Sequence, residues 1–139
     1  MIKKITTDNE RDFAISYWLD FYRKSSPFAK AIAPSVYFDE HKKRALECLK
    51  ANAYVYVDPK DMDHYLGFIC GTRGIGQDIL HFAYVKKSVR GIGIGAQMAE
   101  TLYEGTKSKE LIITHQGEIF GLKNWHEKVI YNPYKFLKL

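Results

Sequence analysis

The sequence predicts a single α/β domain built on a mixed central sheet of about six strands flanked by about four helices. Apolar runs of strand length alternate with amphipathic runs of helix length along the 139 residues. One strand-like run, 79–85, leads through a glycine-rich turn directly into a helix-like run that starts at residue 94. A chain of this length is expected to form one domain, residues 1–139, with a proper hydrophobic core.

In the first half of the chain, local patterns predict a strand, two helices and a hairpin. Thr7 and Glu10 have the spacing of a capping box, so a helix is expected to follow Thr7 directly. Asp39 is expected to cap the second helix. In order, the expected elements are a strand at 2–6, a helix at 8–23, a loop at 25–36, a helix at 39–50, and paired strands at 54–57 and 66–72.

In the second half, strands and helices alternate. Ile94, Met98 and Leu102 recur every four residues, which predicts a helix with one buried stripe. The expected elements are a strand at 79–85, a helix at 94–107, a strand at 111–114, a helix at 117–127 and a closing strand at 130–137.

Composition argues against several functional classes. The net charge of +5 allows a polyanionic partner, but the basic residues form no stripe with interleaved aromatics, so nucleic-acid binding is not expected. No apolar run is long enough for a membrane span, and residues 1–6 lack the apolar region of an export signal. Cys48 and Cys70 fit buried thiols in a reducing cytoplasm. The five histidines have no spacing typical of a metal site.

The stretch 85–95, VKKSVRGIGIG, is the most informative part of the chain. Its glycines permit positive φ and let a ligand approach the backbone closely. The N–H groups at the start of the following helix have no intrahelical partners, and the helix dipole favours an anion there. Lys86, Lys87 and Arg90 add full positive charges. The stretch therefore predicts a site for a diphosphate group.

Other interpretations of these glycines are weaker. Gly91-x-Gly93-x-x-Ala96 fits a dinucleotide fingerprint, but the acidic residue at the required distance, Glu110, precedes the next apolar run instead of ending it. A Walker-type loop is excluded because no Gly-Lys-Ser/Thr follows. A turn that binds nothing remains open, although three basic residues argue against it.

Arg90-x-x-Gly93-x-Gly95, five residues after the strand-ending Val85, resembles the acetyl-coenzyme A signature of the GNAT acyltransferases. The order of the predicted elements is also the order found in that family. The resemblance implies a GNAT fold that binds acetyl-CoA as co-substrate and transfers the acetyl group to a primary amine of a small molecule or a protein. Transfer would be by direct attack in a ternary complex. It implies cofactor contacts from Ala83, Tyr84, Val85, Lys86, Arg90, Gly91, Ile92, Gly93, Ile94, Gly95 and Ala96, with the Val85 N–H polarising the thioester carbonyl.

Acetyl transfer to an amine needs a group that takes a proton from the amine. His81 is the first candidate, because it interrupts an otherwise apolar strand where some amine acetyltransferases of the family carry a histidine. An exposed or packed strand histidine is an equally good interpretation. Asp78 is a second candidate through water, although an ordinary turn residue is the stronger interpretation. For the acid that protonates the leaving thiolate, His126 occupies the place of the family's tyrosine, and Tyr131 is the substitute. The family's Gly-Phe after this helix is missing here.

The resemblance also places an acceptor groove between the first two helices and the later strands. Aromatic residues expected there are Tyr22, Phe28, Tyr37, Phe38 and those of 131–134. The chain also resembles, more loosely, small phage-encoded GNAT-like proteins. The residues that carry this resemblance are WLxxYR at 18–23 and YNPY at 131–134. The alternative function is a structural or binding module of GNAT fold with weak or no catalysis. Domains of this family often form homodimers.

Overall fold

A computed structural model of the chain describes residues 1–116 and 125–137. Its centre is a sheet whose six strands follow one another in chain order. The first four strands are antiparallel, whereas β4, β5 and β6 are parallel neighbours. This arrangement confirms the predicted mixed α/β sheet. The strands are β1 (Ile2–Lys4), β2 (Ala53–Asp58), β3 (Asp61–Thr72), β4 (Gln77–Val85), β5 (Glu110–Ile113) and β6 (Lys128–Tyr131).

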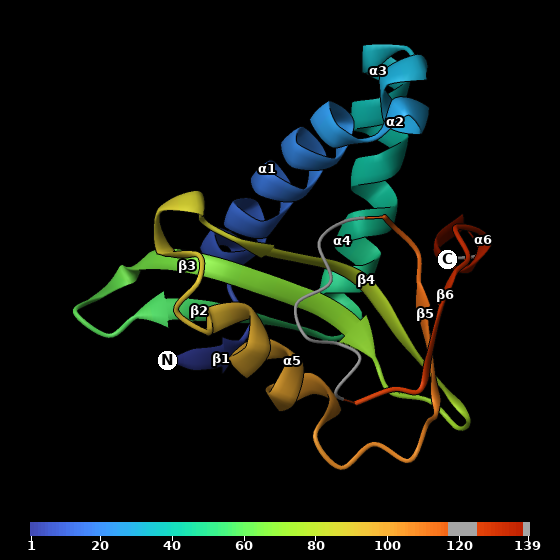
Figure 1. Ribbon diagram of the computed structural model, residues 1–139. Helices are drawn as coiled ribbons and strands as arrows, with labels where there is room; N and C mark the ends of the chain where they lie inside the picture. Colours follow the sequence, from blue (N-terminus) through green and yellow to red (C-terminus); the bar gives the residue numbers. More distant parts are fainter. Residues whose placement is uncertain (117–124, 138–139) are drawn as a thin grey trace.

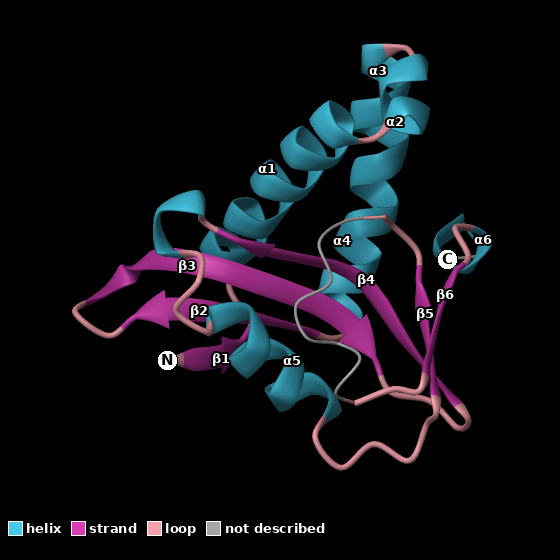
Figure 2. Cartoon of the chain, in the orientation of Figure 1, coloured by secondary structure: helices cyan, strands magenta, loops and turns pink. Residues whose placement is uncertain are grey.

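Helices cover both faces of the sheet (Figures 1 and 2). Helices α1 (Asp8–Ser25) and α4 (Lys42–Ala51) pack on one face, and α5 (Ile94–Tyr103) packs on the other. The shorter helical segments are α2 (Pro27–Ala31), α3 (Pro34–Val36), a π-helical turn (Tyr37–His41), a 3-10 turn (Lys87–Val89) and α6 (Tyr134–Leu137).

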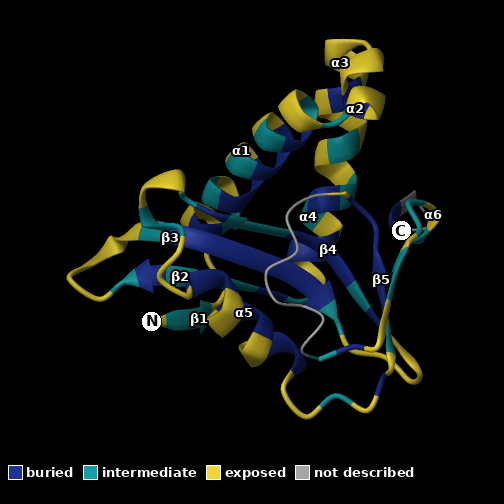
Figure 3. Ribbon diagram, in the orientation of Figure 1, coloured by how far each residue is buried: buried dark blue, intermediate teal, exposed yellow. Residues whose placement is uncertain are grey.

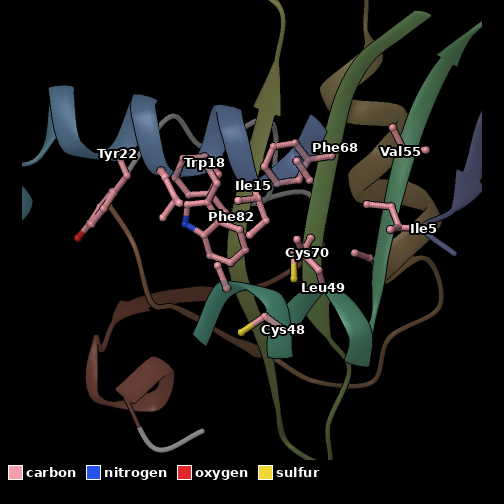
Figure 4. Close-up of a cluster of buried hydrophobic side chains, with 14 of the residues drawn as sticks. Ile5, Ile15, Trp18, Tyr22, Cys48, Leu49, Val55, Phe68, Cys70 and Phe82 are labelled. Carbon is pink, nitrogen blue, oxygen red and sulfur yellow. The ribbon is translucent and has the colours of Figure 1, made fainter. Parts of the chain in front are cut away.

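Each face of the sheet has its own hydrophobic core (Figure 3). On the α1 face, the indole of Trp18 stacks on the ring of Phe82 from β4, with ring centroids 5.3 Å apart (Figure 4). On the opposite face, the predicted stripe of α5 is confirmed, because Ile94, Met98 and Leu102 are all buried. Because β4 contributes to both cores, its position in the molecule is fixed from both sides.

The N-terminus of α1 forms as its capping box predicts. The Thr7 hydroxyl accepts a hydrogen bond from the N–H of Glu10, and the Glu10 carboxylate accepts one from the N–H of Thr7. Glu10 is 2% exposed and also accepts from the N–H of Thr6 and from Lys3. Burial alone would raise the pKa of Glu10, but these donors lower it from 4.5 to about 2.

Several expected elements differ in the structure. The predicted loop at 25–36 contains α2 and α3, each of which begins with a proline, a residue well suited to a first helical turn. Asp39 lies inside the π-helical turn and caps nothing, because the helical path already starts at Pro34 and continues into α4.

The C-terminal half also differs in detail. Helix α5 stops at Tyr103, where Gly105 adopts a φ of +74° soon after the helix end. The predicted closing strand splits into β6 and α6, because Pro133 lies between them and has no N–H for a strand ladder. Most of the predicted helix at 117–127 lies outside the described residues, and 125–127 are not helical.

Substitution of Glu10 by Gln is expected to make the free energy of unfolding depend less on pH below about pH 4.5. The folded-state pKa of Glu10 lies below its value in the unfolded chain, so its stabilisation is present above about pH 4.5 and is lost as pH falls toward 2. We expect Glu10→Gln to cost about 2 kcal/mol of unfolding free energy at pH 7 and almost nothing at pH 2. Urea unfolding at both pH values measures this difference, and the exposed Glu40→Gln is the control. Equal losses from Glu10→Gln at both pH values would contradict the assignment.

Candidate functional site

The turn between β4 and α5 has an open backbone. Gly91 and Gly93 have φ of +87° and +93°, a region that favours glycine. A Cβ at Gly91 would meet no atom within 4 Å, so the space in front of the turn is open. No side chain caps α5, and its first turn carries no acidic residue. The first N–H groups of α5 are therefore available to an anion.

Two of the three cations of this turn, Lys86 and Arg90, are held against aromatic rings of α1. The Lys86 Nζ lies 5.7 Å from the ring centre of Phe13. The guanidinium carbon of Arg90 lies 5.9 Å from the ring centre of Phe21, and its Nε donates to the Val85 carbonyl at 2.9 Å. Cation–π contacts of this kind restrict both side chains. The positive charge is therefore kept at the end of β4.

Beyond its midpoint, β4 presents an edge without a strand partner. The N–H of Lys86 bonds to Leu66 of β3, so the alternate residues Ala83 and Val85 direct their N–H groups away from β3. On that other side, pairing with β5 ends at Leu80 and Ile113. The two strands then diverge, as Figure 2 shows. Within the described residues, no strand covers the edge from Ala83 to Val85.

A chain of hydrogen bonds begins where β4 and β5 separate. His81 Nδ1 lies 3.0 Å from Thr114 Oγ1, which lies 2.9 Å from His115 Nδ1. His115 Nε2 in turn lies 2.9 Å from His41 Nε2. His81 is 6% exposed, and Cys70 and His81 together lower the pKa of the buried Cys48 thiol. Residues from β4, from the segment directly after β5 and from the π-helical turn are thus joined in one polar chain inside an aromatic core.

The two histidines at the outer end of this chain are uncharged at neutral pH. Burial, with a contribution from Arg44, lowers the pKa of His41 from 6.5 to about 4. Burial also lowers the pKa of His115 well below its usual value, and its neighbours His41 and His81 act in the same direction. A neutral imidazole has one N–H donor and one acceptor nitrogen, so the chain can be satisfied without any charge.

His41, Thr114 and His115 also line a cavity of about 320 Å³. This is the lower end of the range typical of small-molecule sites. The remaining lining residues are Tyr22, Phe28, Tyr131, Pro133, Tyr134 and Phe136. Burial, with Tyr22 beside it, raises the pKa of Tyr131 above its usual value of 10, so its hydroxyl keeps its proton at neutral pH.

Two aromatic residues expected in the acceptor groove lie elsewhere. Tyr37 is 1% exposed and donates from its hydroxyl to the Leu19 carbonyl at 2.7 Å, so it belongs to the core. Phe38 is exposed and packs on Tyr37, outside the cavity lining. The residue types alone could not separate these two from Tyr22 and Phe28, which do line the cavity.

Two other predicted residues pair at the opposite end of β4. His126 donates from Nε2 to Asp78 Oδ2 at 2.8 Å, and both side chains are fully buried. Asp78 also accepts from Thr106 and from the N–H of Gly74. Burial raises the pKa of Asp78, but these donors outweigh it and lower the pKa. Asp78 is seven residues before Val85, about 23 Å along the strand, so the structure does not bring His126 or Asp78 to the glycine turn.

Sequence reasoning missed His41, Thr114 and His115. A signal for the last two was present, because polar residues that directly follow a buried parallel strand lie at the sheet edge where ligands often bind. His41 had no such signal, since its position depends on the π-helical turn. Within residues 1–116 and 125–137, no group of three or more His, Cys, Asp or Glu could hold a metal ion. No helix in this part of the chain is long and apolar enough to cross a membrane.

Loss of the buried Asp78–His126 pair is expected to destabilise the fold. His126→Ala leaves a buried carboxylate with one donor fewer and should cost about 1–3 kcal/mol. His64→Ala is the matched control, because His64 also pairs with an aspartate, Asp58, but is 47% exposed. We expect that control to change stability by less than about 0.5 kcal/mol. Thermal unfolding compares the two, and equal effects would argue against a structural role for His126.

Comparisons with known proteins agree with this architecture. No protein-family model matches the sequence, and no curated protein sequence matches it. A candidate acetyl transferase from Pyrococcus furiosus superposes with a TM-score of 0.57 at 18% identity, covering 86% of this chain and 84% of that one. An aminoglycoside 6′-N-acetyltransferase solved with coenzyme A aligns at 21% identity and a TM-score of 0.49, over 73% of this chain and 52% of that one. The first of these likenesses, together with the mixed six-stranded sheet, shows that the chain has the GNAT fold.

Proposed function

We propose that this protein is an acetyl-CoA-dependent N-acetyltransferase that transfers an acetyl group to a primary amine by direct attack in a ternary complex. One observation carries the proposal: the uncapped N-terminus of α5 lies next to the open edge of β4. A diphosphate fits the first feature, and an extended arm with amide groups fits the second. Acetyl-CoA combines a diphosphate with such an arm.

The residues of the turn would bind the diphosphate through backbone N–H groups at Gly93 to Ala96, with Lys86 and Arg90 supplying charge. An anion at a helix N-terminus is worth roughly 0.3–1 kcal/mol, and about 2 kcal/mol when partly buried. Along the edge of β4, Ala83 and Val85 direct N–H groups toward the arm. The Val85 N–H is the candidate donor to the thioester carbonyl, where it would stabilise negative charge that develops during transfer.

For proton transfer, His81 and Tyr131 remain the proposed residues. His81 lies on β4 two residues before Ala83, and its hydrogen bond to Thr114 orients its ring. Tyr131 lines the cavity and holds its proton at neutral pH, as a proton donor to the thiolate must. The buried hydrogen bond of His126 to Asp78 supports a structural role for that residue instead.

A second function, a binding module of the same fold with weak or no catalysis, is favoured by one observation. His126, the residue at the family's acid position, lies at the far end of β4 and is bonded to Asp78. The likeness of 18–23 and 131–134 to small phage-encoded proteins also belongs to this alternative and stays a prediction. The same holds for a cytoplasmic location and for a homodimer.

Calorimetric titration of acetyl-CoA tests the proposed cofactor site. We expect micromolar binding by the unmodified protein and its loss in the double variant Arg90→Glu/Gly93→Asp. The two substitutions together change the charge of the turn by −3. They also put an aspartate at a positive φ, where a side chain is strained. Arg73→Glu/Gly76→Asp is a matched control, because it makes the same charge change and Gly76 has a φ of +81° with open space around it. Gly76 precedes β4, at the end opposite to the site.

Equal loss of binding in the two double variants would show a nonspecific charge effect. Absence of binding by the unmodified protein would overturn the transferase proposal and leave the binding-module alternative.

Substitution of His81 is expected to slow turnover without weakening the binding of acetyl-CoA. We expect His81→Ala to lower kcat by about 10²–10⁴-fold, which is the usual contribution of a general base. Release of the free thiol from acetyl-CoA in the presence of primary amines reports turnover, and calorimetry reports affinity. His81→Gln, which keeps a polar partner for Thr114, distinguishes lost chemistry from lost packing. Loss of acetyl-CoA affinity in His81→Gln, measured as a large rise in the dissociation constant, would contradict the catalytic role.

A further inference from the structure

The cavity beside β5 and β6 has an unusual chemical character for a site that would receive an amine. Five of its nine lining residues are Tyr or Phe, and two more are histidines. Among residues 1–116 and 125–137, no carboxylate lines it, so an ammonium ion would lose its hydration there without gaining a counter-charge from them. Its histidines are neutral, and the nearby Arg44, which lowers the pKa of His41, adds repulsion toward a cation.

The cavity also lies close to the open edge of β4. Its wall residues Tyr22 and His115 contact Phe82, with ring centroids 6.3 and 5.8 Å from the Phe82 ring. Phe82 is three residues before Val85, about 10 Å along the strand. A ligand arm that starts at the glycine turn and follows the β4 edge toward the junction with β5 therefore points its end toward this cavity.

One ring nitrogen in the wall is available to take a proton. His41 uses Nε2 to bond His115, whereas His41 Nδ1 has no hydrogen-bond partner among the described residues. When Nδ1 takes a proton, the Nε2 proton can pass to His115, and from there through the Thr114 hydroxyl to His81. His41, His115 and the Thr114 hydroxyl each accept one proton and donate another in this sequence, and the transferred proton with its positive charge ends on His81.

We propose that this cavity binds a neutral aromatic primary amine of one or two rings as the acetyl acceptor, and that His41 is the first group to take the amine proton, which the chain then passes to His81. The inference rests on the proposed transferase function and names its substrate class. The amine nitrogen forms a bond to the acetyl carbon while the bond from that carbon to sulfur breaks. One amine proton goes to His41 Nδ1, and the thiolate leaves with a proton from Tyr131 or solvent. Aromatic amines are weak bases and enter the cavity uncharged, whereas alkyl amines enter as cations.

A matched pair of probes tests the ligand class. Calorimetry without cofactor compares 4-methylaniline, which is neutral at pH 7, with 4-methylcyclohexylamine, which is a cation of similar shape. We expect the aromatic probe to bind at least tenfold more tightly. Phe28→Ala should weaken its binding about five- to tenfold, because Phe28 lines the cavity. Phe38→Ala is the control, because Phe38 is a similarly exposed neighbour outside the lining and should have no effect.

Tighter binding of the cyclohexyl probe would overturn the proposal and indicate an aromatic cage for cations. Absence of binding by both probes would also overturn it. Binding of 4-methylaniline without thiol release, under conditions where acetyl-CoA binding is measured, would overturn the acceptor role but leave the ligand class supported. Thiol release with other primary amines would then show that the transferase function stands. Acetylation of the cyclohexyl probe alone would overturn the ligand class and support the transferase function.

Substitution of His41 tests the proton acceptor. His41→Gln can still donate a hydrogen bond to His115 but has no nitrogen that takes a proton. We expect kcat for 4-methylaniline to fall by about 10²-fold with KM unchanged. A kcat that stays within twofold of the unmodified protein would assign proton removal to His81 or solvent and overturn the role of His41.

Discussion

The hydrogen bond from the Thr114 N–H to the Leu80 carbonyl is the last one that joins β4 to β5, and the candidate site depends on where it falls. Had the pairing continued, a neighbouring strand would cover the N–H groups of Ala83 and Val85. Because it ends halfway along β4, one half of the strand is fixed in the sheet and the other half keeps an open edge. Packing on both faces, with Phe82 against Trp18 and Leu80 against the α5 side, holds this edge without a partner strand.

The aromatic face of α1 connects the two halves of the site. Near its start, Phe13 and Tyr17 lie under the Lys86 ammonium, and Phe21 lies under Arg90. Near its end, Tyr22 lines the cavity and packs against His115. One helix therefore positions both the cations at the glycine turn and the wall of the proposed acceptor site. The aromatic residues of α1 therefore form part of the core and also contact both parts of the candidate site.

Local patterns predicted the fold and the glycine turn well, because both depend on neighbours in sequence. The alternation of apolar residues located the strands, the Thr7–Glu10 box located the start of α1, and glycine spacing located the start of α5. The cavity depends on contacts between residues far apart in the chain, such as His41 with His115 across 74 positions. No spacing rule in a single sequence encodes such a pair. For the same reason, the sequence could not show that His126 turns toward Asp78.

The histidine chain would set the order of proton movements in the proposed transfer. A neutral imidazole carries its proton on one nitrogen, so the chain is fully paired when His41, His115 and the Thr114 hydroxyl all donate toward His81. Passage of one proton moves every hydrogen to the far side of its group and reverses that sense. A second proton cannot follow until the rings have exchanged tautomers again. Under the proposed function, the chain passes a single proton and must then be reset before it passes the next, so one proton is removed per turnover.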